Sequence, residues 1–188
     1  MQLPLVPNDK YRNWGVQEGV FTKEECEKVV RLFDKLPKEK GGIHAGSKEP
    51  ERRDSMIAWL RYGGEGDWIY KRLWERLQKI NETHYRYDLV HIQSLQLTQY
   101  VEAGHYIWHA DMSWGKNSVR KLSCTVQLTD PAEYEGGDLI LRTHVDEKAP
   151  RTQGALVFFP SFIVHCVEPV TKGTRHSMVS WVAGPPFR

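Results

Sequence analysis

The chain has 188 residues, 40% hydrophobic and 27% charged, which fits one globular domain with a single core. Its 26 basic and 24 acidic residues leave a net charge of +2, too balanced for an electrostatic nucleic-acid footprint. No apolar run is long enough to span a membrane and the N-terminus lacks a signal peptide's apolar core, so we expect a cytoplasmic protein without a membrane partner.

Two helices are predicted in the N-terminal half. A capping box at residues 22–25 begins the first, because a threonine hydroxyl and a glutamate can satisfy each other's free backbone donors, and its apolar stripe stops at Pro37. A second apolar stripe predicts a helix from residue 67 to about 81. Between them, the glycine-rich, charged segment 38–54 is predicted to be a mobile loop, or a strand with loose ends.

After residue 89 the pattern changes to short aromatic and β-branched stretches separated by turn-forming residues, which predicts strands. The predicted strands are 95–100, 121–128, 138–142, 155–159 and 177–182. Helices followed by short strands predict an α+β, mainly β domain: a double-stranded β-helix (jelly roll, cupin-like) buttressed by N-terminal helices. We expect one domain over 1–188, with the helical support at about 1–88 and the jelly-roll core at about 89–188.

His109, Asp111 and His165 are the candidate metal ligands. Residues i and i+2 of a strand face the same side, so His109 and Asp111 can turn toward one ion. Two imidazoles and one carboxylate leave coordination positions open, which suits a non-haem Fe(II) oxygenase that also binds a chelating co-substrate and dioxygen. A structural zinc site would be closed and rich in thiolates, and the chain has no CxxC pair. Taken alone, the HxD motif is weak, and His109 also fits a buried core histidine.

Arg175, ten residues after His165, is a candidate anchor for the co-substrate. A guanidinium can bind a carboxylate through two parallel hydrogen bonds, and Ser177 adds a hydroxyl on the same strand face. A dicarboxylate that chelates iron at its keto-acid end needs such a partner at its far end. Together with the three candidate ligands, this favours an anchor over an ordinary surface ion pair.

Motifs over most of the chain carry a family resemblance. They are LTQY at 97–100, YIWHAD at 106–111, LSCTVQL at 122–128, YEGGDL at 134–139, FFPS at 158–161 and the segment 173–181. On these motifs, and on its opening helix, the chain resembles the prolyl 4-hydroxylase-like branch of the 2-oxoglutarate/Fe(II) oxygenases, which includes the PKHD-type bacterial and phage hydroxylases.

The resemblance implies roles for individual residues. The implied iron ligands are His109, Asp111 and His165. The implied co-substrate residues are Arg175, Ser177, Tyr100 and Gln127, with Arg175 on the 2-oxoglutarate C5 carboxylate. Tyr106 and Trp181 are the implied substrate-binding residues. Two departures stand out: collagen-type prolyl hydroxylases usually have lysine in place of Arg175, and Gly104 is one place late in the family's YxxGxxY pattern, which leaves the role of Tyr106 open.

The resemblance implies a dioxygenase that uses Fe(II), 2-oxoglutarate and O2, with ascorbate as an auxiliary, and releases succinate and CO2. It would hydroxylate an unactivated C–H, with a prolyl residue of a protein or peptide as the expected substrate. The same chemistry on a free amino acid, a small metabolite or a nucleobase is the first alternative. A non-catalytic cupin-like binding module is the second, and a zinc or manganese metalloenzyme the third.

The residues Arg52, Arg53 and Trp59 fit either a substrate lid or a solvated face.

Overall fold

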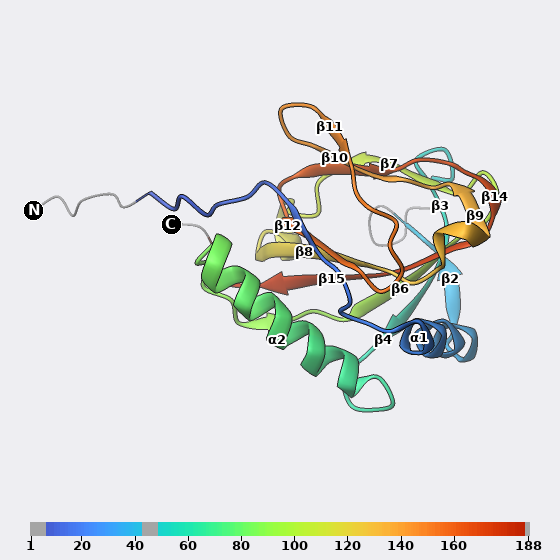
Figure 1. The fold of residues 1–188 in the computed structure, drawn as a ribbon, viewed down its shortest axis with the longest axis horizontal. Helices are drawn as coiled ribbons and strands as arrows, with labels where there is room; N and C mark the ends of the chain where they lie inside the picture. The colour runs from blue at the N-terminus through green and yellow to red at the C-terminus, as the bar shows by residue number, and fades with distance from the viewer. Residues whose placement is uncertain (1–6, 43–48, 187–188) are drawn as a thin grey trace, which may run out of the picture.

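The computed structural model describes residues 7–42 and 49–186, which form two helices and two facing antiparallel sheets (Figure 1). The strand order of the larger sheet is β1 (Gly15–Gln17), β12 (Leu156–Pro160), β8 (Arg120–Gln127), β15 (Arg175–Ala183), β6 (Leu95–Tyr100), β4 (Met56–Leu60) and β2 (Lys38–Lys40), with β5 (His91–Ile92) also paired to β15. The smaller sheet has the order β11 (Asp146–Lys148), β10 (Leu139–Arg142), β13 (Val164–Val167), β7 (His105–His109) and β3 (Arg53–Asp54). A short ribbon pairs β14 (Val170–Gly173) with β9 (Tyr134–Gly136), and 3-10 turns lie at Gly115–Asn117 and Pro131–Glu133. The predicted double-stranded β-helix is confirmed.

Both predicted helices are present, as α1 (Lys23–Lys35) and α2 (Asp67–His84). The predicted capping box begins α1: the Glu25 backbone N–H donates to Thr22 Oγ1 at 3.3 Å, and the Thr22 N–H donates to Glu25 Oε2 at 3.0 Å. Helix α2 runs three residues beyond its predicted end at 81. Among the residues that the structure describes, no helix has the length and apolarity needed to cross a membrane.

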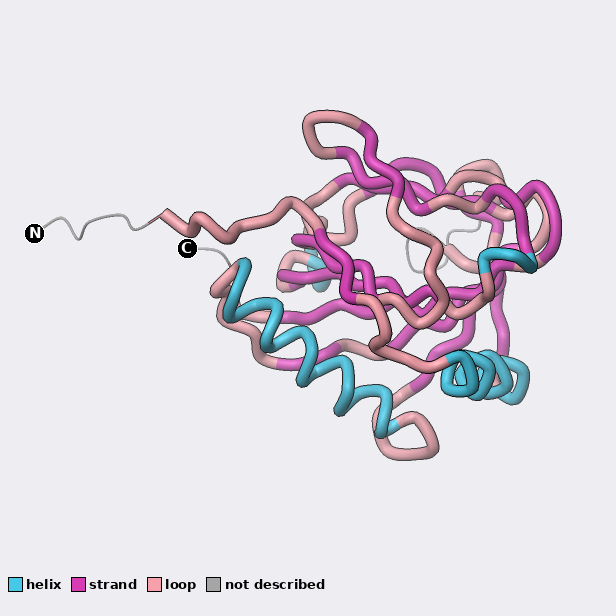
Figure 2. Tube along the Cα trace, viewed as in Figure 1, coloured by secondary structure: helices cyan, strands magenta, loops and turns pink. Residues whose placement is uncertain are grey.

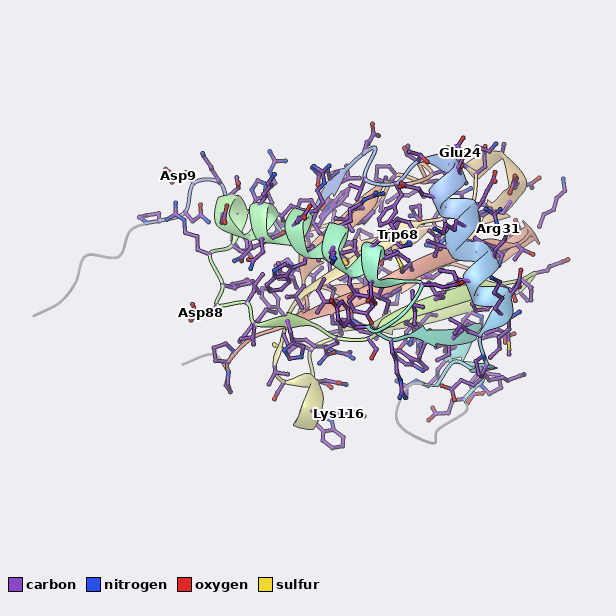
Figure 3. The ribbon with its side chains drawn as sticks, turned by 90° about the horizontal axis from the view of Figure 1, so that it is seen from below. Asp9, Glu24, Arg31, Trp68, Asp88 and Lys116 are labelled. Carbon is purple, nitrogen blue, oxygen red and sulfur yellow. The ribbon has the colours of Figure 1, made fainter. Side chains whose placement is uncertain are left out.

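The two helices cover the outer face of the larger sheet, as Figures 2 and 3 show from two directions. The apolar side chains of the two helices pack against one face of the larger sheet and form one buried cluster with it. The helix members include Cys26, Val29, Phe33, Leu73 and Leu77, and the strand members include Leu97, Leu122, Cys124, Val126 and Met178. Burial of these side chains fixes the helices on the sheet and leaves its other face turned toward the smaller sheet.

That inner face is unusually polar for a buried surface. The alternate positions of β6, β8 and β15 hold polar or charged side chains that are almost fully buried. They are Gln96, Thr98, Ser123, Thr125, Gln127, Arg175 and Ser177. A second, smaller buried apolar cluster includes Tyr100 of β6, Leu141 of β10 and Phe159 of β12. The space between the two sheets is therefore lined by polar side chains on the side of the larger sheet.

All five predicted strands are present, and β6 has the predicted bounds 95–100. The N-terminal half also contributes strands that periodicity did not predict: β2 and β4 extend the larger sheet, and β3 joins β7. These short segments show little alternation of apolar and polar residues, so they form strands because they pair with strands that are distant in the sequence. The segment 38–54, predicted to be a mobile loop or a strand with loose ends, begins in β2 and ends in β3, and its middle, 43–48, lies outside the described residues.

Candidate metal centre

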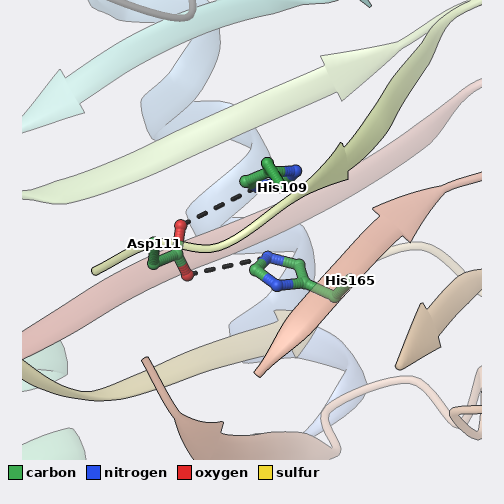
Figure 4. A group of neighbouring side chains, drawn as sticks. All are labelled: His109, Asp111 and His165. Carbon is green, nitrogen blue, oxygen red and sulfur yellow. Dashed lines mark ion pairs between the residues drawn. The ribbon is translucent and has the colours of Figure 1, made fainter. Parts of the chain in front are cut away.

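The structure brings His109, Asp111 and His165 together between the two sheets (Figure 4). His109 ends β7 and lies opposite His165 of β13 in the strand register, and Asp111 follows two residues after β7. The Nε2 atoms of His109 and His165 lie 3.8 Å and 3.6 Å from the two Asp111 carboxylate oxygens. One ligand atom from each residue lies within 4.8 Å of the others, which fits three ligands around one ion.

Backbone carbonyls orient both imidazoles. His109 Nδ1 lies 2.8 Å from the Ile107 carbonyl oxygen, and His165 Nδ1 lies 3.0 Å from that of Ile163. A carbonyl only accepts, so each Nδ1 carries the proton and each Nε2 presents its lone pair toward Asp111. A hydrogen bond on the far nitrogen is the usual way in which proteins fix the tautomer of a ligand histidine.

The charges of the group suit a cation. Burial, aided by neighbouring His165, lowers the pKa of His109 to about 3, so its ring is neutral at physiological pH. Burial alone would raise the pKa of Asp111, but the two imidazoles lower it overall, which keeps the carboxylate ionised. Asp111 Oδ2 is buried and has no hydrogen-bond partner among the described residues. A buried carboxylate oxygen that faces two imidazole Nε2 atoms is a donor set that a divalent metal ion satisfies.

Tyr106 lies directly against this group. Its ring stacks on the His109 imidazole with centroids 3.6 Å apart and planes inclined by 18°, and burial raises the pKa of its phenol to about 12. The stack holds the His109 ring in place from one side. The predicted contact of Tyr106 with substrate stays a prediction.

The predicted co-substrate residues also lie together. Arg175 is 1% exposed, and its Nη2 donates to Gln127 Oε1 at 2.9 Å. Its guanidinium carbon lies 5.4 Å from the centroid of the Tyr100 ring, and buried Ser177 follows two residues later on β15. Arg175 Nε and Nη1 are buried without a hydrogen-bond partner in the described parts of the chain. A buried cation with two free donors is a site for an anion, and a carboxylate matches its forked geometry.

Trp181 is connected to the metal centre through Arg120, which the sequence did not single out. The Arg120 guanidinium carbon lies 3.9 Å from the centroid of the Trp181 ring. Arg120 Nη1 donates to the Asp111 carbonyl oxygen at 3.2 Å, and Nε donates to Gln93 Oε1 at 3.0 Å. The only sequence signal for Arg120 is its position at the start of a strand that follows the HxD motif.

Arg53 is also part of the interior, so the expectation of a solvated face is wrong for this residue. It is 7% exposed, and its guanidinium carbon lies 4.6 Å from the centroid of the Tyr106 ring, because Arg53 and Tyr106 are register partners in β3 and β7. Arg52 stays at the surface, in an ion pair with Glu49. Trp59 is 37% exposed.

Residues 95–183 match the family model of the 2OG-Fe(II) oxygenase superfamily, and this segment contains the three candidate ligands and Arg175. The matched segment is a little less than half of the chain, and the fold and the three candidate ligands are consistent with this superfamily. The chain is also similar to a PKHD-type hydroxylase of Synechococcus sp. (strain CC9605), at 38% identity over 93 residues. That alignment covers 48% of this chain and 42% of the relative, so it spans less than half of the relative's length.

Two solved structures show the same fold over nearly the whole chain. A Pseudomonas putida prolyl-4-hydroxylase superposes with a TM-score of 0.72 at 19% identity, covering 92% of this chain and 93% of that one. A Trichoplax adhaerens prolyl hydroxylase, in complex with a hypoxia inducible factor oxygen degradation domain peptide fragment, superposes with a TM-score of 0.76 at 16% identity. That superposition covers 91% of this chain and 83% of the other.

Proposed function

We propose that this chain is an Fe(II)- and 2-oxoglutarate-dependent dioxygenase that hydroxylates a prolyl residue of a protein or peptide. One observation carries the oxygenase assignment. A two-histidine, one-carboxylate group and a buried arginine with free donors line the same interior between the sheets. A metal-binding module of cupin type would have no use for a dicarboxylate anchor.

Different residues would bind the metal and the co-substrate. His109, Asp111 and His165 would hold the ion, and three protein ligands suit a metal that also binds a co-substrate and dioxygen. Arg175, oriented by Gln127, receives the far carboxylate of 2-oxoglutarate. When bound, Fe(II), 2-oxoglutarate and dioxygen supply the oxidising chemistry, with succinate and CO2 as co-products. The protein orients the substrate C–H and keeps bulk water away from it, and no side chain acts as a general base.

The prolyl substrate is supported by the relatives. The similar curated protein is a PKHD-type hydroxylase, and the two superposed structures are prolyl hydroxylases, one of them with a peptide. Hydroxylation of a free amino acid, a small metabolite or a nucleobase would use the same metal and co-substrate residues. Product analysis with proline-containing peptides and with free proline separates these cases.

The decisive experiment is an anaerobic titration of the apo-protein with Fe(II) and then 2-oxoglutarate, followed by visible absorption. A weak charge-transfer band that requires both additions is expected. The Arg175→Ala variant is expected to need much more 2-oxoglutarate for the same band, whereas Arg151→Ala, which removes an arginine from the ion pair with Asp138, is expected to behave as the wild type. Absence of the band in fully metallated protein would refute the oxygenase assignment.

A further inference from the structure

A basic pocket of about 350 Å³ is linked to the candidate metal centre through Arg120, one of its lining residues. Three cations and two tryptophans contribute to its lining: Arg61, Lys116, Arg120, Trp59 and Trp181. The remaining lining residues are polar and uncharged, so no acidic side chain lines the pocket. Glu39 accepts a hydrogen bond from the Trp59 indole at 2.9 Å but is not among the lining residues.

Arg120 connects this pocket to the ligand residue Asp111. Its guanidinium donates to the Asp111 carbonyl oxygen, and the guanidinium carbon lies 3.9 Å from the centroid of the Trp181 ring. A group seated against Arg120 and Trp181 would therefore sit beside the candidate metal centre. Arg61 and Lys116 are exposed and form the outer rim.

The cations around the site share a feature that calls for an anion. Three arginines donate to a glutamine oxygen, in the pairs Arg53 with Gln96, Arg120 with Gln93 and Arg175 with Gln127. Within residues 7–42 and 49–186, none of these arginines, nor Arg61 or Lys116, has a carboxylate within ion-pair distance. A glutamine orients a guanidinium but leaves its charge unneutralised, and an uncompensated charge in a partly dry site is costly.

The proposed co-substrate balances only part of this charge. Asp111 and the keto-acid carboxylate of 2-oxoglutarate would balance the two positive charges of the metal. The far carboxylate of 2-oxoglutarate would balance the charge of Arg175. Arg53 and Arg120 then remain without a counter-charge, together with Arg61 and Lys116 on the rim. The remaining partner that enters this site is the substrate.

We propose that the substrate is an acidic peptide, which places carboxylate side chains next to the hydroxylated residue in the pocket of Arg61, Lys116 and Arg120. This inference rests on the proposed function and names its substrate class. The tryptophans supply apolar faces for the peptide's own side chains and backbone. An extended nucleic-acid strand would need a long basic groove, and the chain's net charge of only +2 gives no support for one.

Binding of two labelled pentapeptides tests the proposal. Each has a central proline, flanked on both sides by two aspartates in one peptide and two asparagines in the other, and fluorescence polarisation reports the dissociation constant. At low salt we expect the aspartate peptide to bind at least about tenfold more tightly, since two or three partly exposed ion pairs add up to about this preference. The preference is expected to shrink at about 0.5 M salt, because screening weakens such pairs.

Two double variants that remove the same charge test whether the preference for the aspartate peptide comes from the pocket. Arg61→Ala with Lys116→Ala is expected to reduce the preference for aspartate to less than about threefold. Lys71→Ala with Lys79→Ala removes the same charge from exposed positions of α2 and is expected to leave the preference unchanged. All four side chains are exposed, so both double variants should fold.

Three results would overturn the proposal: equal binding of the two peptides, equal loss of preference in both double variants, or tighter binding of a five-nucleotide single-stranded DNA. The binding assay needs no turnover. Its failure in a protein that shows the Fe(II)–2-oxoglutarate band would refute the acidic substrate alone, whereas loss of the band refutes the proposed function itself.

Discussion

Replacement of Arg175 by methionine should separate folding stability from co-substrate binding. The side chain is 1% exposed, has two buried donors without a partner in the described chain, and makes one hydrogen bond, to Gln127. Methionine has a similar length and no polar hydrogens. It therefore removes both the anchor for a carboxylate and the buried charge that the unliganded fold must tolerate.

The magnitudes follow from these contacts. Each unsatisfied buried donor costs about 1–3 kcal/mol, and loss of the bond to Gln127 leaves one oxygen unsatisfied at a similar cost. The unfolding free energy of the metal-free variant should therefore be unchanged, or higher by up to about 3 kcal/mol. Binding of 2-oxoglutarate should weaken by about 2–5 kcal/mol, a roughly 30- to 5,000-fold rise in Kd.

Urea denaturation of the metal-free protein and an anaerobic 2-oxoglutarate titration measure the two effects. Arg151→Met provides a control with the opposite expectation. Arg151 donates to buried Asp138, so its loss should lower the unfolding free energy by about 1–3 kcal/mol and leave the Kd for 2-oxoglutarate unchanged. If Arg175→Met proved less stable than Arg151→Met, or bound 2-oxoglutarate as the wild type does, the anchor argument would be wrong.

Further predictions concern the metal, an ion pair and the core. Asp111→Asn should lose Fe(II) on dialysis while remaining folded, as metal analysis and circular dichroism would show; retained iron would contradict its role as a ligand. Asp138→Asn should lower the unfolding free energy by about 1–3 kcal/mol at pH 7. Burial would raise the pKa of Asp138, but Arg151 and Lys148 lower it overall. Its stabilisation is therefore present above the unfolded pKa of about 4 and disappears as the pH falls through the lower folded value, so urea titrations at pH 7 and pH 3 should show a difference that shrinks. Leu73→Ala, in a fully buried position, should cost about 2–5 kcal/mol of unfolding free energy without changing the Kd for 2-oxoglutarate in the folded protein; a cost below about 1 kcal/mol would contradict its place in the core.

Local rules account for the parts of the fold that the sequence predicted. The capping box at Thr22 and the helical stripes depend on contacts three or four residues apart, which the sequence displays directly. Strands such as β6 and β15 carry an apolar face for the helices. The HxD spacing likewise depends only on the alternation of side chains, which places His109 and Asp111 on one side.

Pairing between distant segments decided the rest. His165 meets His109 only because β13 and β7 pair in one particular register, 56 positions apart in the chain. The segment that contains Arg53 carries no strand pattern of its own, and its pairing with Tyr106 turns a charged side chain inward.

The sequence by itself therefore determined the class of fold, the candidate ligands and the candidate anchor, because short-range periodicity and motifs encode them. The tertiary structure alone decided which neutral partners hold the arginines, and that Arg120 and Trp181 share a pocket with Arg61 and Lys116. Such contacts join residues from separate strands and loops. Their geometry depends on packing and register, which are properties of the assembled sheets and not of any one segment.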